Sequence, residues 1–184
     1  MERAVFLDRD GVINRVLIRD GRPYPPASLD ELEIMPGVAD ALRDLKSAGL
    51  RLIVATNQPD VAKGFQRRDM VEAFHDQLRC TLPVDDIRVC YHVDADACFC
   101  RKPRPGMLLD AARAWNVDLA GSYMIGDRWR DIDAGRAAGC KTIWVRCDYD
   151  ERLPEQPDAV VVSLWEASRL ILANGQPLAA SRSQ

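Results

Sequence analysis

A short apolar run that stops at two carboxylates constrains this chain more than any other feature. Residues 4–7 are apolar, and Asp8 and Asp10 follow with one residue between them, before Gly11. A run of this length beside a glycine is typical of a buried strand rather than a helix. Because ligands of open parallel sheets bind beyond the carboxyl ends of the strands, both carboxylates are expected at a binding site, where they need a cation or another basic partner. Two solvated aspartates in a loop are the alternative interpretation.

The apolar runs that follow alternate with segments of helical periodicity, which predicts an α/β fold. Further strands are expected at residues 51–55, 87–92, 122–125, 141–145 and 159–162, and helices at 38–48, 69–81, 108–115, 133–138 and 164–172. We therefore expect a doubly wound, Rossmann-like, mostly parallel sheet with helices on both faces. The Asp20-Gly21 pair is typical of a hairpin turn and predicts a short β-hairpin flap, too short to be a cap domain.

Length and composition favour a single globular domain. The chain has 184 residues, 47% of them hydrophobic, and a net charge of −3. We expect one domain over residues 1–173 and a flexible tail over 174–184. The charge gives no reason to expect a nucleic-acid partner, and no apolar run approaches the roughly 18 residues that a membrane helix needs. Because the N-terminus lacks a signal-peptide pattern, we expect a cytoplasmic protein. We also expect a monomer rather than an oligomer.

Three of the six cysteines surround one histidine, and this cluster predicts a metal site. Cys90, His92, Cys98 and Cys100 lie within eleven residues. Four soft or borderline ligands suit tetrahedral Zn²⁺ and leave no ligand position for water, so the site would be structural and would hold a loop without a core of its own. Reduced, unligated thiols and a redox pair are the alternatives. The remaining cysteines are expected to be small buried hydrophobic residues: Cys80, Cys140 and Cys147.

Polar residues follow two other predicted strands. Thr56, Asn57 and Gln58 come after the strand at 51–55, and such hydroxyl and amide groups can hold a phosphoryl oxygen without adding charge. A turn that uses Asn57 is the alternative. Arg101 and Lys102 follow the cysteine cluster, where bound zinc would fix their direction. Arg101 is expected to bind a second anionic group on a substrate, because its planar fork matches phosphate geometry, unless the pair is merely solvated.

One more strand ends at acidic residues. Asp127 follows the strand at 122–125 and can complete a Mg²⁺ site with Asp8 and a backbone carbonyl of Asp10. Asp131 lies one helical turn further on and is expected to orient Lys102 or a bound water. Arg128 is a second candidate for binding a distal anionic group.

In chain order, these stretches resemble the four motifs of the haloacid dehalogenase superfamily of phosphohydrolases. The motifs are Asp-Arg-Asp-Gly-Val at 8–12, Thr56, Lys102, and the Asp127/Asp131 pair, and the resemblance covers roughly residues 4–172. It implies a Mg²⁺-dependent phosphatase in which Asp8 is the nucleophile that forms an aspartyl-phosphate and Asp10 is the general acid and base. It also implies that Lys102 binds the phosphate and screens the nucleophile.

The cysteine loop before Arg-Lys-Pro narrows this resemblance. It is similar to the loop of the D-glycero-D-manno-heptose 1,7-bisphosphate phosphatases and the histidinol-phosphate phosphatases, and the motifs lean towards the heptose enzymes. A small phosphorylated sugar is therefore the expected substrate, with histidinol phosphate or a broader range of sugar phosphates as alternatives. A phosphate-binding or zinc-stabilised interaction module is the non-enzyme alternative. Pro59-Asp60, Asp94 and a longer hairpin around residues 19–26 depart from the usual family pattern.

Overall fold

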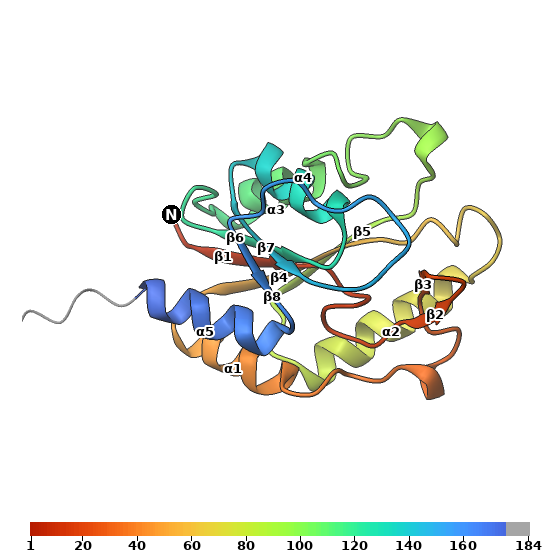
Figure 1. The fold of residues 1–184 in the computed structure, drawn as a ribbon, viewed down its shortest axis with the longest axis horizontal. Helices are drawn as coiled ribbons and strands as arrows, with labels where there is room; N and C mark the ends of the chain where they lie inside the picture. The colour runs from red at the N-terminus through yellow and green to blue at the C-terminus, as the bar shows by residue number, and fades with distance from the viewer. Residues whose placement is uncertain (176–184) are drawn as a thin grey trace, which may run out of the picture.

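A parallel sheet of six strands forms the centre of the computed structural model, which describes residues 1–175 (Figure 1). The strands lie in the order β5-β4-β1-β6-β7-β8, and every pair of neighbours is parallel. Their bounds are β1 (Ala4–Leu7), β4 (Arg51–Asn57), β5 (Asp86–Cys90), β6 (Tyr123–Gly126), β7 (Lys141–Val145) and β8 (Ala159–Val161). The predicted doubly wound α/β fold is therefore confirmed.

Helices cover both faces of this sheet (Figure 1). One face carries α3 (Gly106–Trp115) and α4 (Trp129–Ala138), and the other carries α1 (Val38–Ser47), α2 (Arg68–Thr81) and α5 (Leu164–Gly175). Short 3₁₀ helices lie at Leu29–Glu31 (η1) and Asp94–Asp96 (η2). Among the described residues, no helix combines the length and apolar character needed to cross a membrane.

Alternate residues of β1 face the two helical layers. Val5 packs in a cluster with Leu42 of α1, whereas Phe6 packs in a second cluster with Leu108 of α3. Successive side chains of a strand point to opposite faces, so a continuous apolar run fits a strand that is covered on both sides. All of β1 is buried. The run that the sequence places before Asp8 is thus the central strand of the sheet.

The strand order reverses at β1. The chain runs from β1 to β4 and β5 on one side, and then returns to β6, β7 and β8 on the other. The carboxyl ends of β1, β4 and β6 therefore meet at one edge, where ligands of doubly wound sheets bind. The register of the sheet fixes how far each strand extends relative to its neighbours, because Leu7 pairs with Val54 of β4 and with Ile125 of β6.

The predicted hairpin is present as β2 (Leu17–Arg19) and β3 (Arg22–Tyr24). Asp20 and Gly21 at its turn both have positive φ, 49° and 71°, as a two-residue turn of the Asn-Gly and Asp-Gly type requires. The backbone N–H of Asp150 donates to the carbonyl of Gly21 at 2.7 Å. A Cβ on Gly21 would lie 2.8 Å from Cβ of Asp150, so this close approach requires glycine.

Several boundaries and one burial prediction differ from the sequence-based expectations. β5 ends at Cys90 rather than at residue 92, and α4 begins at Trp129, where Asp131 accepts the N–H of Arg128 at 3.0 Å and so caps the helix. Cys80 is exposed, because the buried face of α2 carries Phe74 and Leu78 instead. Cys140 is buried and Cys147 half-buried. The predicted tail begins at 174, but α5 continues to 175, and residues 176–184 lie outside the described residues.

Candidate active site

Three buried carboxylates meet at the edge where β1 and β6 end. Asp8, Asp127 and Asp131 each offer one oxygen, and these oxygens all lie within 4.8 Å of one another. Asp8 follows β1 directly, and its N–H donates to the carbonyl of Ile125 at 2.9 Å. Asp127 follows β6, and Asp131 lies in the first turn of α4. Such a concentration of negative charge away from water requires compensation.

Lys102 supplies part of that compensation. Its Nζ lies 2.8 Å from Oδ1 of Asp8 and 2.5 Å from Oδ1 of Asp131, and the residue is only 1% exposed. Burial raises the pKa of Asp8 to about 6, although Lys102 opposes the shift. Burial and repulsion from Asp8 raise the pKa of Asp127 well above its ordinary value. One ammonium group therefore does not balance three carboxylates.

The donor atoms that remain fit a divalent cation. Oδ1 of Asp127 is buried and has no hydrogen-bond partner among the described residues. Its other oxygen accepts the hydroxyl of Tyr149 at 2.7 Å, and its backbone carbonyl accepts Nε1 of Trp144 at 2.9 Å, so the carboxylate is held in place. Hard carboxylate oxygens are the ligands that Mg²⁺ prefers. Asp8 and Asp127 would hold the ion, with Asp131 beside it and bound to the lysine.

The side chain of Asp10 is surrounded by donors. It accepts two hydrogen bonds from Nη2 of Arg9, at 2.8 and 3.0 Å, one from Asn14 at 2.9 Å and one from Gln58 at 2.7 Å. Although burial acts to raise it, the charge of Arg9 and these hydrogen bonds hold the pKa of Asp10 below its ordinary value. Asp10 is therefore a carboxylate in the free protein, fixed close to Asp8.

A second layer behind Asp10 fixes Arg9. This arginine is fully buried, its Nη1 lies 3.1 Å from Nε2 of His75, and its guanidinium lies 5.5 Å from the ring centre of Phe74. Burial, and then the charge of Arg9, lower the pKa of His75 to about 4, so the imidazole is neutral at pH 7. A neutral ring can accept a hydrogen bond from the guanidinium without repelling it. Nδ1 of His75 lies 3.5 Å from the carboxylate of Glu72.

Residues 56–58, the Thr-Asn-Gln segment, form hydrogen bonds that position other residues of the site. Nε2 of Gln58 donates to Asp10 and also to Oγ1 of Thr56, at 2.9 Å. The amide of Asn57 bonds the backbone of Lys102 in both directions, at 3.0 and 3.1 Å. Both amides line the cavity, but these bonds show that they position Asp10 and Lys102, a role that the sequence did not indicate.

The two arginines expected to bind a distal anion differ in the structure. Nε of Arg101 bonds Asp94 at 2.8 Å, while its Nη1 is buried without a partner among the described residues. Arg128 forms a two-bond pair with Glu151, at 2.6 and 2.7 Å, so its fork is already occupied. Binding of a distal anion by Arg128 stays a prediction, and such an anion would have to displace Glu151, which the loop after β7 brings against it.

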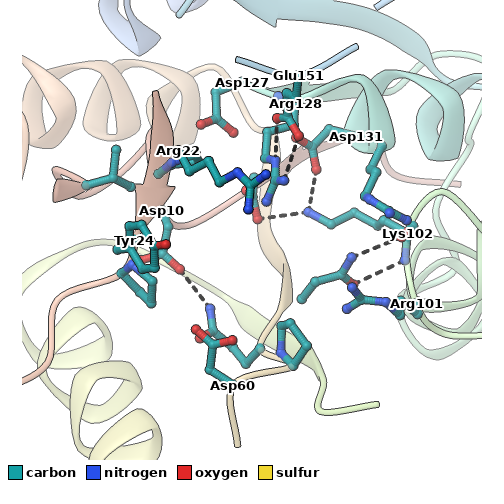
Figure 2. Close-up of a pocket in the computed structure, with 18 of the residues that line it drawn as sticks. Asp10, Arg22, Tyr24, Asp60, Arg101, Lys102, Asp127, Arg128, Asp131 and Glu151 are labelled. Atoms are coloured by element: carbon teal, nitrogen blue, oxygen red, sulfur yellow. Dashed lines mark hydrogen bonds and ion pairs between the residues drawn. The ribbon is translucent and has the colours of Figure 1, made fainter. Parts of the chain in front are cut away.

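These groups border a cavity of about 510 Å³, large enough for a small phosphorylated molecule (Figure 2). The buried side of the cavity, which we call its inner wall, holds Asp8, Asp127, Asp131 and Lys102, and the exposed side, its outer wall, includes residues of the hairpin. The lining is rich in charge of both signs, which suits a polar, anionic ligand rather than an apolar one.

The cysteine cluster lies beside this cavity and has the geometry of a zinc site. The Sγ atoms of Cys90, Cys98 and Cys100 are 3.2 to 3.7 Å apart, and Nδ1 of His92 lies 3.4 Å from Cys100. These separations are too long for a disulfide, and tetrahedral ligation at about 2.3 Å would place sulfur atoms roughly 3.8 Å apart. The four ligands expected from the sequence therefore do converge.

Four contributing residues were not predicted: Arg9, His75, Tyr149 and Glu151. Arg9 lies between the two aspartates, which was the only signal for it. His75 lies within a helix without a motif around it, and it is buried against Arg9. Tyr149 and Glu151 belong to an irregular loop whose sequence shows no periodicity.

Substitution of Gly11 tests the metal site. Its φ is +87°, and a Cβ there would lie 2.0 Å from Oδ2 of Asp127. We expect Gly11→Ala to displace this carboxylate and weaken Mg²⁺ binding about tenfold or more, measured by calorimetric titration. Gly64→Ala is the matched control, because Gly64 has a similar φ of +75° and nothing within 4 Å. Equal Mg²⁺ affinity in both variants would contradict the placement of Asp127 at the metal.

His75 makes the stability depend on pH. Because its folded pKa of about 4 lies below the unfolded value of 6.5, the unfolded chain binds the proton more readily. The contribution of neutral His75 to the free energy of unfolding is complete above pH 6.5 and is lost as the pH falls towards 4. We expect the difference in free energy of unfolding between wild type and His75→Gln to shrink by about 2 kcal/mol from about pH 7.5 to about pH 4.5 in urea titrations. A constant difference would argue against a neutral buried imidazole.

Comparisons with known proteins agree with this geometry. A family model described as HAD-hydrolase-like matches residues 99–167. The D-glycero-beta-D-manno-heptose-1,7-bisphosphate 7-phosphatase of Rhodopseudomonas palustris is 41% identical over 148 residues, which are 74% of this chain and 79% of that protein. The enzyme of the same name from Escherichia coli K12 is 37% identical over 180 residues, 91% and 89% of the two chains.

A solved structure is also similar. The D,D-heptose 1,7-bisphosphate phosphatase of Bordetella bronchiseptica, crystallised with magnesium and phosphate, matches with a TM-score of 0.80 at 34% identity, over 94% of this chain and 99% of that one. The resemblance predicted from the four motifs is thus confirmed. The chain belongs to the haloacid dehalogenase-like hydrolases, in the family of the heptose bisphosphate phosphatases.

Proposed function

We propose that this protein is a Mg²⁺-dependent phosphatase that removes the 7-phosphate of D-glycero-D-manno-heptose 1,7-bisphosphate through an aspartyl-phosphate. The convergence of Asp8, Asp127 and Asp131 within 4.8 Å, with Lys102 between two of them, carries the proposal. The relatives bear this enzyme's name, and the Bordetella protein binds magnesium and phosphate. A charged cavity of about 510 Å³ suits such a substrate.

Asp8 is the proposed nucleophile. Lys102 holds one of its oxygens, and the side chain keeps 11% exposure on the cavity, so phosphorus can be approached from there. Attack by Oδ of Asp8 forms an aspartyl-phosphate and breaks the bond between phosphorus and the sugar oxygen. This divides one difficult displacement into two easier steps. Water then attacks the phosphorus of the intermediate and regenerates the carboxylate.

Asp10 is the proposed general acid and base. It donates a proton to the departing sugar oxygen and later takes one from the attacking water. In the free site its pKa is lowered, mainly by Arg9 against the effect of burial, so it holds no proton before substrate arrives. The negative phosphate would raise this pKa, because nearby like charges favour the neutral acid. Gln58 and Asn14 keep the carboxylate aimed at the cavity.

Thr56 and Lys102 would hold the oxygens of the transferred phosphoryl group. Both are buried; Lys102 donates to Asp8, and Thr56 lies near the end of β4, the strand that pairs with β1. When bound by Asp8, Asp127 and the backbone carbonyl of Asp10, Mg²⁺ would supply positive charge that neutralises these carboxylates together with the phosphate. Asp131 orients the ammonium of Lys102 rather than contacting substrate.

Arg101 is the proposed ligand of the phosphate that stays on the sugar. Its Nη1 is a buried donor without a partner among the described residues, and the residue lines the cavity. It follows Cys100 directly, so zinc held by the four cysteine and histidine ligands would fix its direction. The two-bond pair with Glu151 makes Arg128 a weaker candidate.

Three expectations from the sequence stay predictions. They are the cytoplasmic location, the monomeric state, and the division of the chain into a domain at 1–173 and a tail.

The nucleophile assignment has a direct test. We expect Asp8→Asn to lower turnover at least about a thousandfold, because an amide cannot form the acyl-phosphate. Release of phosphate from the heptose bisphosphate, followed by ³¹P NMR to identify the position cleaved, measures this. Asp40→Asn on α1 is the control. Wild-type rates in Asp8→Asn would refute the assignment, and faster turnover of histidinol phosphate than of the bisphosphate in wild type would refute the substrate.

The zinc site also has a test. We expect Cys98→Ser to lose bound zinc, to lower the melting temperature by about 5 °C or more, and to lower activity through Arg101 and Lys102. Zinc content by mass spectrometry of metals and melting by circular dichroism are the measurements. Cys80→Ser, at an exposed position, is the control. Zinc-free wild-type protein with full activity and unchanged melting would count against a structural zinc.

A further inference from the structure

The hairpin of β2 and β3 places in the cavity an arginine that the proposed mechanism leaves unused. Arg22 is the first residue of β3 and lines the cavity together with Asp8 and Lys102. Figure 2 shows its side chain reaching from the hairpin into the cavity. Arg19, which pairs with it in the hairpin register, does not line the cavity. Its guanidinium lies 5.8 Å from the ring centre of Tyr24 instead, so only one arginine of the hairpin lines the cavity.

The charge of Arg22 is not neutralised by the protein. Each of the other cations of the cavity has a carboxylate partner within 4.0 Å: Lys63, Arg101, Lys102, Arg128 and Arg130. Within residues 1–175, the side chain of Arg22 forms no hydrogen bond or ion pair. An anionic ligand in this cavity would thus find one guanidinium whose whole fork is available.

The position of Arg22 is fixed by the adjacent turn. Gly21 lies against Asp150, with their backbones joined by a hydrogen bond of 2.7 Å. In the same loop, the hydroxyl of Tyr149 donates to Asp127, and the carboxylate of Glu151 accepts a hydrogen bond from Arg128. The hairpin is therefore docked on the segment that also holds the metal-binding carboxylate, which reduces the entropy lost when Arg22 binds a ligand.

Depth in the cavity indicates which part of the substrate Arg22 meets. The transferred phosphate must lie at the inner wall, beside Asp8 and the buried Lys102. Arg22 is exposed and belongs to the outer wall. We propose that Arg22 is a specificity-determining residue that binds the phosphate remaining on the sugar, the 1-phosphate, and that the hairpin thereby selects bisphosphorylated substrates. This inference rests on the proposed function and adds a residue to that site.

The test compares a substrate with two phosphates and one with a single phosphate. We expect Arg22→Ala to lower kcat/KM for the heptose 1,7-bisphosphate about tenfold or more, mainly through KM, because a charge-assisted two-bond contact is lost. Hydrolysis of p-nitrophenyl phosphate, which has no second phosphate, should stay within about twofold of wild type. Arg22→Lys keeps the charge without the fork and should recover part of the loss.

Arg19→Ala is the matched control, since it removes an arginine from the same hairpin outside the cavity, and it should leave both substrates unaffected. An unchanged kcat/KM for the bisphosphate in Arg22→Ala would overturn the inference, and so would an equal loss for both substrates, which would place Arg22 at the transferred phosphate. Wild-type protein that hydrolyses p-nitrophenyl phosphate but not the bisphosphate would instead refute the proposed substrate, and the assignment of Arg22 with it.

Discussion

Repulsion among buried carboxylates is the constraint on which the rest of this site depends. Asp8, Asp127 and Asp131 have only one ammonium group, that of Lys102, between them. Breaking a buried ion pair of this kind costs roughly 3–5 kcal/mol, so the lysine is firmly held. The negative charge that it leaves uncompensated favours a divalent cation, and that cation in turn favours a phosphate. The binding preferences of the cavity thus follow from a charge imbalance in the protein itself.

Sheet register brings these groups together without any local sequence proximity. The pairing of Leu7 with Ile125 places the residues after β1 and β6 side by side, and pairing with Val54 brings Thr56 to the same edge. A shift of one residue in either pair would turn every side chain to the opposite face. The continuous burial of β1 on both faces resists such a shift, because Val5 and Phe6 belong to different cores. Core packing therefore fixes the geometry of the site.

Residues at strand ends could be predicted from the sequence, because a carboxylate or hydroxyl directly after an apolar run has one obvious position in a parallel sheet. Residues that act through other residues could not be predicted in this way. The amides of Asn57 and Gln58 line the cavity, and nothing in the sequence shows that they also bond Lys102 and Asp10. The contact of Arg9 with His75 joins positions 66 residues apart and depends on where α2 lies relative to the segment after β1.

The irregular segments limited the sequence-based prediction in the same way. Arg128 stands beside the aspartate that we propose as a metal ligand and was expected to bind an anion, but Glu151, from a loop without periodicity, occupies its fork. No pattern in residues 146–158 indicates that contact, because loops carry no repeat that fixes which face is inward. The cysteine cluster was predictable for the opposite reason, since its ligands are close in sequence and chemically distinctive.

The division between strand ends and irregular segments also separates chemistry from selection. The reacting groups are buried, and the two cores of the sheet hold them in register. The groups at the outer wall, Arg22 among them, lie on a hairpin and loops that contribute little to either core. A change in the hairpin therefore costs little folding free energy, whereas a change beside Asp8 disturbs a buried charge network. This asymmetry lets a hairpin lengthen and acquire a new cation while the phosphoryl chemistry at its base stays intact.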